Sequence, residues 1–165
     1  GVVVGAPRPQ GGLDYEALAR FREAARDVRI VLPRAIDLVA DPVEAVRRVA
    51  ALGYDKILSS GGAPRAIDGA ATLAAMVEAA GEHLSIIAGS GITSDNVAWL
   101  LEHTGVREVH ASASCPGPAP HPDALGFGFA RGPRNRTDAG RVRALREAIA
   151  QWKRSRRTAE LDGLR

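Results

Sequence analysis

Short apolar runs alternate with amphipathic stretches along most of the chain. Runs rich in Val, Ile and Leu are typical of buried strands, and apolar residues spaced three or four apart are typical of helices. The predicted strands are residues 1–6, 28–32, 56–60, 84–88 and 108–113. The predicted helices are residues 15–26, 67–80 and 96–103, with another that starts at Pro42 and stops before Gly53. The chain is therefore a succession of strand–helix units.

The helix boundaries carry their own signals. Asp14 and Asp41 are predicted N-caps, because a carboxylate there can accept a hydrogen bond from a free N–H of the first turn. Pro42 follows Asp41 at the first helical position, which proline favours. Glycines that can end a helix in the left-handed conformation follow three of the helices, at Gly53, Gly81 and Gly105.

Strands that alternate with helices indicate an α/β fold with a parallel sheet. Units of nearly equal length favour a (β/α)8 barrel of the TIM-barrel type over an open doubly wound sheet. That barrel needs eight strands, whereas the pattern supplies five. We therefore expect about five strand–helix units of a barrel, in a fragment of a longer protein whose first three units precede residue 1.

Composition narrows the class of protein. No apolar run approaches the roughly 20 residues of a membrane span, so we expect a cytoplasmic protein with no membrane partner. Cys115 is the single cysteine, which excludes a disulfide or a multi-thiolate metal cage within one chain. A basic excess is confined to residues 131–165, and aromatic residues make up only 4% of the chain. We therefore expect no nucleic-acid partner.

Five motifs occur in an order that resembles a known family. They are a strand ending in Arg-Ala-x-Asp and a helix opened by Asp-Pro in "PRAIDLVADPVEAV", a strand ending in Ser-Gly-Gly in "KILSSGG", a glycine-rich strand end in "IIAGSGITSDNV" and a strand ending in His-x-Ser in "TGVREVHASAS". Together they resemble the later part of the CutC copper homeostasis family, over at least residues 31–114, and "RTDAGRVRALREAI" is similar to the family's closing helix. The resemblance implies a (β/α)8 barrel, a role in copper homeostasis or tolerance, and copper ion as the partner or cofactor.

Two features depart from the family. Pro33 precedes Arg34-Ala35-Ile36-Asp37, where the family usually has a histidine. The resemblance also implies that the cysteines proposed as copper ligands lie in the family's amino-terminal part, ahead of these motifs. We accordingly predict no metal ligand within this chain.

The candidate site lies where the strands end, because barrel enzymes place their sites on that face. The predicted residues for binding a substrate or anion are Arg34, Ser59, Ser60, Gly61, Gly89, Ser90, Gly91 and Ser112. A helix starting near Ser94 or Asp95 would add N–H groups that favour an anion. The alternative is a tight turn with Thr93 as helix cap.

Arg34 and Asp37 are predicted to form a charge pair. Such a pair can orient a carboxylate or phosphate ligand through the guanidinium group. Alternatively, the two side chains only pair with each other at the barrel mouth and bind no ligand. His110 is the one histidine expected inside the barrel, and with Asp37 it is the best available acid–base pair. The alternative function is therefore a TIM-barrel enzyme for a small anionic or phosphorylated substrate. Whether there is turnover stays open.

The carboxyl-terminal part is expected to be less regular. The Gly/Pro-rich segment after Cys115 predicts either a lid over the strand ends or a disordered loop. Residues 137–153 predict an amphipathic helix that completes a domain over residues 1–153, followed by a basic, frayed tail at 154–165. Exposed sheet edges favour a homo-oligomer.

Overall fold

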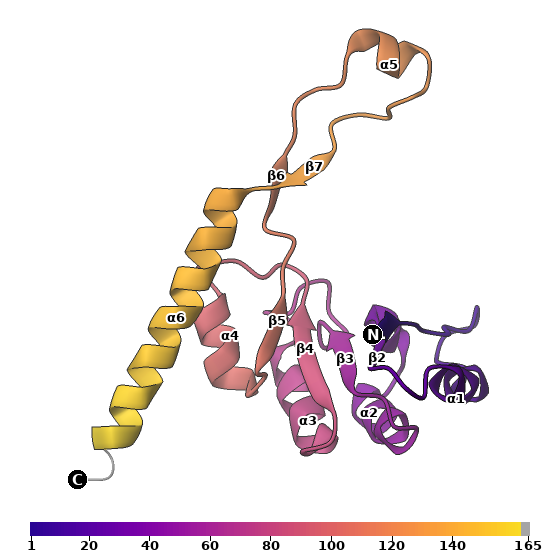
Figure 1. Cartoon of the computed structure of the whole chain (residues 1–165), viewed down its shortest axis with the longest axis vertical. Coiled ribbons are helices and arrows are strands. Elements are labelled where there is room, and N and C mark those ends of the chain that lie inside the picture. Colours follow the sequence, from indigo (N-terminus) through magenta and orange to yellow (C-terminus); the bar gives the residue numbers. More distant parts are fainter. Residues whose placement is uncertain (163–165) are drawn as a thin grey trace. The chain divides into compact units, whose positions relative to one another are not determined.

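The computed structural model describes residues 1–162, and they fall into two compact units. The sheet unit comprises residues 1–92 and 96–111, and the ribbon unit comprises residues 93–95 together with the chain from Ser112 onward. Figure 1 shows the elements of both units, and each unit is described separately.

The sheet unit contains five parallel strands. They are β1 (Val2–Val3), β2 (Ile30–Leu32), β3 (Lys56–Ser59), β4 (Ser85–Gly89) and β5 (Glu108–His110). Their spatial order is β1-β2-β3-β4-β5, the same as their order along the chain. The five predicted strands are confirmed, although β5 ends at His110 rather than at residue 113.

Four α-helices connect these strands. They are α1 (Tyr15–Ala24), α2 (Pro42–Ala51), α3 (Ala70–Ala80) and α4 (Val97–Thr104), with a 3-10 helix η1 (Arg34–Leu38) between β2 and α2. Crossovers between neighbouring parallel strands are right-handed, which places the helices on one face of the sheet (Figure 1). A doubly wound sheet would reverse its strand order and carry helices on both faces. The sequential order is that of a barrel, as predicted.

Two predicted helix N-caps, Asp14 and Asp41, are confirmed. Asp14 Oδ1 accepts a hydrogen bond from Ala17 N at 3.0 Å, and Asp41 Oδ1 accepts one from Glu44 N at 2.9 Å. Gly53, Gly81 and Gly105 all have positive φ, as expected of glycines that end helices.

The fourth helix starts within one residue of the predicted position 96, but after Ser94 and Asp95, the other starts considered. It begins at Val97 with Asn96 as N-cap, so Ser94 and Asp95 precede it and Thr93 is not its cap. Asn96 Nδ2 instead donates to Gly91 O at 2.8 Å, which ties the residue before the helix back to the strand end.

The core lies between the sheet and its helices. Side chains alternate along β3, so that Ile57 and Ser59 are buried while Lys56 and Leu58 on the opposite face are partly exposed. The largest fully buried side chains come from strands and helices alike: Leu18, Ile30, Leu32, Ile36, Leu73, Met76 and Leu100. Burial of the helix-facing side of the sheet therefore holds the strand ends in place.

The ribbon unit contains an antiparallel pair of strands, β6 (Ser114–Pro116) and β7 (Asn135–Thr137). A one-turn helix, α5 (Pro122–Gly126), lies between them, so the segment after Cys115 is a β-ribbon with a short helix rather than a structureless loop. The last helix, α6 (Ala139–Asp162), continues past the predicted end at Lys153. The division into a domain at 1–153 and a tail at 154–165 stays a prediction. In the part of the chain that the structure describes, none of the helices could cross a membrane.

Candidate functional site

The predicted site residues of the sheet unit lie at the carboxyl ends of its strands. Asp37 and Arg34 belong to η1, directly after β2, while Ser59 ends β3 and Ser60 follows it. Because β2 and β3 are parallel neighbours, with Leu32 level with Ile57, these two strand ends meet at one edge. We call the four side chains the strand-end cluster.

Asp37 is the centre of the strand-end cluster. Its Oδ1 accepts hydrogen bonds from Ser59 Oγ at 2.6 Å and from the backbone N–H groups of Ser60 and Gly62, each at 3.1 Å. Its Oδ2 accepts from Arg34 Nε at 2.7 Å and from Ser60 Oγ at 2.9 Å. The side chain of Asp37 is only 7% exposed. Both oxygens are therefore occupied by the protein's own donors.

These contacts set the protonation state of Asp37. Burial raises the pKa of the carboxyl, but hydrogen bonds from Ser59, Arg34, Gly62 and Ser60 outweigh it and bring the pKa below its ordinary value of 3.8. A general base needs a pKa near the working pH. The Asp37 environment instead keeps a permanent carboxylate, which suits a structural anchor.

Arg34 is the member of the strand-end cluster that still faces solvent. Besides its bond to Asp37, its Nη2 donates to Ser60 Oγ at 2.6 Å and to Ala63 O at 3.3 Å. The side chain remains 40% exposed. The predicted Arg34–Asp37 pair is thus present, and the outer edge of the guanidinium group is its one surface available to an anion.

Gly61 allows a close approach of two backbone segments. Its φ is +73°, and a Cβ added there would lie 2.2 Å from Gly69 O, just before α3. Gly61 is also buried, and its N–H donates to Ser59 Oγ at 2.9 Å. Its position is explained by packing between the β3 exit and the start of α3.

The Gly89-Ser90-Gly91 turn is held by the neighbouring loop. Ser90 Oγ donates to Pro64 O at 2.6 Å, and Ser90 O accepts from Ala66 N at 3.0 Å. A Cβ at Gly89 would lie 2.7 Å from Leu58 Cδ1 on the neighbouring strand. The polar atoms of Ser90 thus join β4 to the loop after β3, which agrees with the tight-turn alternative. Anion binding by the turn stays a prediction.

His110 is not brought to Asp37. It ends β5, it is exposed, and two strands separate β5 from the β2 end that leads to Asp37. In the described part of the chain, His110 is not among the hydrogen-bond donors to Asp37. The proposed acid–base pair therefore remains a prediction without a supporting contact.

Ser112 belongs to the ribbon unit. Its Oγ donates to Ser114 Oγ at 3.1 Å, and its carbonyl oxygen accepts from Thr137 Oγ1 at 3.3 Å. These contacts brace the base of the β6–β7 ribbon. A role for Ser112 in binding an anion likewise stays a prediction.

The described residues do not gather several metal-binding side chains at one place. No group of three or more His, Cys, Asp or Glu side chains among them could hold a metal ion. The whole sequence has one cysteine and one methionine, the side chains that Cu(I) prefers. Met76 is fully buried in the core, where its sulfur lies 3.6 Å from Ser59 Oγ.

Two backbone groups complete the strand-end cluster. Gly62 N donates to Asp37, and Ala63 O accepts from Arg34. Neither residue was assigned a site role from the sequence, because glycine and alanine have no polar side chain. The sequence does contain one relevant repeat. Arg-Ala-Ile-Asp occurs at both 34–37 and 65–68, which indicates that this tetrapeptide alone does not define a site.

Comparison with known proteins gives a consistent result. The model of the CutC family matches residues 1–115. A CutC family protein from Xanthomonas campestris pv. campestris (strain 8004) is 42% identical over 149 residues, covering 88% of this chain and 61% of the relative. One from Sinorhizobium medicae (strain WSM419) is 40% identical over 149 residues, covering 90% and 61%. The chain thus spans about three fifths of the length of these curated relatives.

Among solved structures, a crystal structure of CutC from Streptococcus agalactiae is similar. It aligns with a TM-score of 0.60 and 27% sequence identity, over 66% of this chain and 53% of that chain. That protein is provisionally named a copper homeostasis protein.

Proposed function

Because this chain belongs to the CutC family, we propose that the protein acts in copper homeostasis, with copper ion as its partner. The observation that carries the proposal is the family match over residues 1–115. The solved Streptococcus agalactiae protein, whose provisional name includes copper homeostasis, supports it. A cytoplasmic location, expected from the sequence, is part of the same proposal.

In this proposal the described residues supply the frame rather than the copper ligands. Asp37 is bound by five protein donor groups, and Met76 is enclosed in the core. A Cu(I) site takes thiolate or thioether ligands, and a Cu(II) site takes several nitrogen or oxygen ligands. In this proposal the copper ligands come from outside the described residues, among which no three or more His, Cys, Asp or Glu side chains are grouped so as to hold a metal ion.

A copper titration tests this proposal. We would compare this chain with a version joined to the part of the Xanthomonas campestris relative that lies outside the aligned region. Cu(I) affinity would be measured by competition with a chromophoric chelator. We expect the joined protein to bind at least about a hundredfold more tightly, a difference of roughly 2.7 kcal/mol.

Two controls accompany the titration. Circular dichroism would show that both proteins are folded, and Cys115→Ala and His110→Ala in the joined protein should leave its copper affinity unchanged. A joined protein that is folded but binds no copper would contradict the proposed function. Tight binding by this chain alone, lost in Cys115→Ala, would show instead that the ligands lie within it.

A further inference from the structure

A basic side chain stands near the start of each of four consecutive strands. Arg29 directly precedes β2, Lys56 is the first residue of β3, and Arg107 directly precedes β5. His83 precedes β4 by two residues. Because the strands are parallel, these residues gather at the amino-terminal edge of the sheet, opposite the edge that carries the strand-end cluster.

These residues share one cavity. It has a volume of about 520 Å³, within the range of small-molecule sites in proteins. The ionisable side chains that line it are Arg29, Lys56, His83, Arg107, Asp55 and Glu82. Basic groups outnumber acidic ones, and every basic group comes from a different strand start.

The two acidic groups do not neutralise this excess. Asp55 is already bound, since its Oδ2 accepts from Ile30 N at 2.7 Å and lies 3.5 Å from Arg22 Nη1, outside the cavity lining. Glu82 is exposed. Glu82 is therefore the lining carboxylate that remains to balance the charge of the basic groups.

The basic side chains differ in whether they are already paired with a carboxylate. Lys56 Nζ pairs with Glu108 Oε2 at 2.5 Å, and Ser85 Oγ donates to the other oxygen of Glu108 at 2.8 Å. The side chains of Arg29, His83 and Arg107 are exposed and form no hydrogen bond or ion pair within 4 Å with other described residues, although the charge of Arg29 also acts on Glu108. Two guanidinium groups and an imidazole can thus donate to a ligand in the cavity.

We propose that this cavity binds a small molecule carrying more than one anionic group, of the phosphate or carboxylate type. Guanidinium groups pair with such oxyanions through two parallel hydrogen bonds. Arg29 and Arg107 come from strands with two others between them, so a ligand with separated charges suits them better than one compact ion. The site is independent of the copper proposal and lies at the other edge of the sheet.

Calorimetric titration of the 165-residue chain tests the proposal, with tripolyphosphate, citrate and inorganic phosphate as probes. We expect tripolyphosphate to bind at least about tenfold more tightly than phosphate, because it spans more than one basic group. Binding should weaken as ionic strength rises. Citrate as tight as tripolyphosphate would extend the ligand class to polycarboxylates, whereas citrate as weak as phosphate would restrict it to phosphate compounds.

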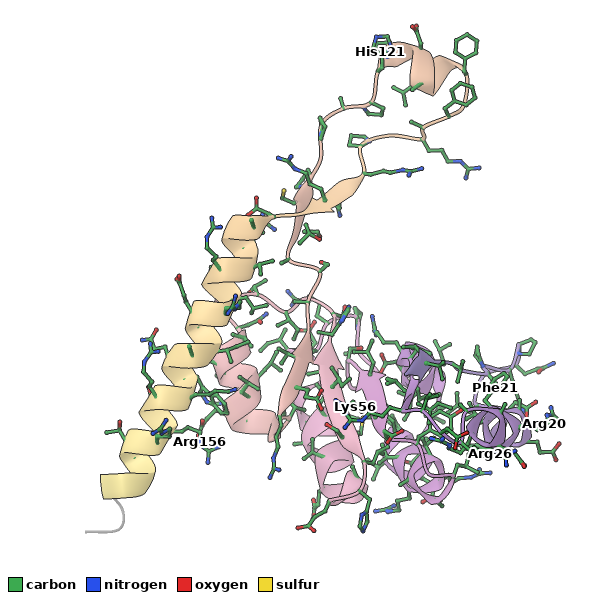
Figure 2. All side chains as sticks on the ribbon, viewed as in Figure 1. Arg20, Phe21, Arg26, Lys56, His121 and Arg156 are labelled. Atoms are coloured by element: carbon green, nitrogen blue, oxygen red, sulfur yellow. The ribbon has the colours of Figure 1, made fainter. Side chains whose placement is uncertain are left out.

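Matched substitutions locate the site. Arg29→Gln and Arg107→Gln should each weaken tripolyphosphate binding by about tenfold. The control is Arg20→Gln, because Arg20 is an exposed arginine on α1, away from Lys56 (Figure 2). All three variants should keep the melting temperature of the ligand-free protein. If Arg29→Gln or Arg107→Gln lowers the melting temperature, the binding measured with the other variant tests the site.

Three results would overturn the proposal. The first is no measurable binding of tripolyphosphate or citrate at low ionic strength. The second is equal weakening by Arg20→Gln, which would indicate attraction to general surface charge. The third is tight binding that neither Arg29→Gln nor Arg107→Gln changes.

Discussion

Replacing Asp37 with asparagine is expected to lower the free energy of unfolding by about 2–3 kcal/mol at neutral pH. The carboxylate is almost fully buried and accepts from Ser59, Ser60, Gly62 and Arg34. The asparagine amide has the same shape, but its NH2 group donates where a carboxylate oxygen accepted, so protein donors lose their acceptor at that position. The charge of Arg34 also loses its partner. The expected loss is smaller than for a fully buried ion pair, because Arg34 is 40% exposed. Urea denaturation followed by circular dichroism measures it.

The chain offers a control with the same local sequence. Arg65-Ala66-Ile67-Asp68 repeats the tetrapeptide of residues 34–37, and Arg65 Nε donates to Asp68 Oδ2 at 2.9 Å. That pair is exposed to solvent, so Asp68→Asn should leave the urea midpoint nearly unchanged. Equal losses for both variants would show that the buried hydrogen bonds of Asp37 contribute nothing special.

The same contacts predict a pH dependence. The pKa of Asp37 is lower in the folded protein than its ordinary value of 3.8, so the unfolded state binds the proton more readily. The stabilisation is therefore complete well above 3.8 and is lost as pH falls through the folded pKa. The difference in stability between the protein and its Asp37→Asn variant should shrink at acidic pH. A difference that is constant with pH would contradict this.

Replacing Gly61 with alanine is expected to cost about 3–4 kcal/mol, among the largest effects of a single substitution. Part of the cost is the left-handed conformation, which an alanine adopts at about 1–2 kcal/mol. The rest is the clash of the new Cβ with Gly69 O, which is backbone and cannot move aside without shifting the start of α3. Thermal and urea denaturation measure the loss.

Gly62→Ala separates these two contributions. Gly62 has the same φ of +73°, but the nearest atom to an added Cβ is Pro42 Cγ at 4.0 Å. Only the conformational cost of about 1–2 kcal/mol applies there. If both alanine variants lose the same stability, the close approach of Gly61 to Gly69 is not what demands glycine.

Much of the architecture was predictable from local pattern. The caps at Asp14 and Asp41 and the helix-ending glycines follow from interactions within a few residues, and the five strands follow from their short apolar runs. The α4 start at Val97 lies one residue after the predicted position 96, with Asn96 as N-cap and its side chain bound to Gly91 O across the turn. The β6–β7 ribbon was also missed, since its strands, Ser114–Pro116 and Asn135–Thr137, carry no apolar run and lie in a Gly/Pro-rich segment.

For the candidate site, the sequence predicted the Arg34–Asp37 pair, because three residues' spacing after a strand brings the side chains together. It did not predict that Ser59 turns away from the barrel interior and bonds Asp37. It also placed His110 inside the barrel, and this stays a prediction: His110 pairs with Gly89 on the face opposite the buried Ala88, and its side chain is exposed on the last strand of the sheet. Exposure depends on which strands and helices cover a position, and those are distant in sequence.

The two copies of Arg-Ala-Ile-Asp show how far local sequence determines the environment of a side chain. In both, the sequence alone determines an arginine–aspartate pair three residues apart, because local geometry is enough to form it. Only the tertiary structure decides that the Asp37 side chain is 7% exposed and the Asp68 side chain 44%. The end of β3 delivers hydroxyl and N–H donors to Asp37, whereas the described structure leaves Asp68 facing water with Arg65 as its partner. Parallel pairing of β2 with β3 therefore makes one copy a buried anchor and leaves the other a surface ion pair.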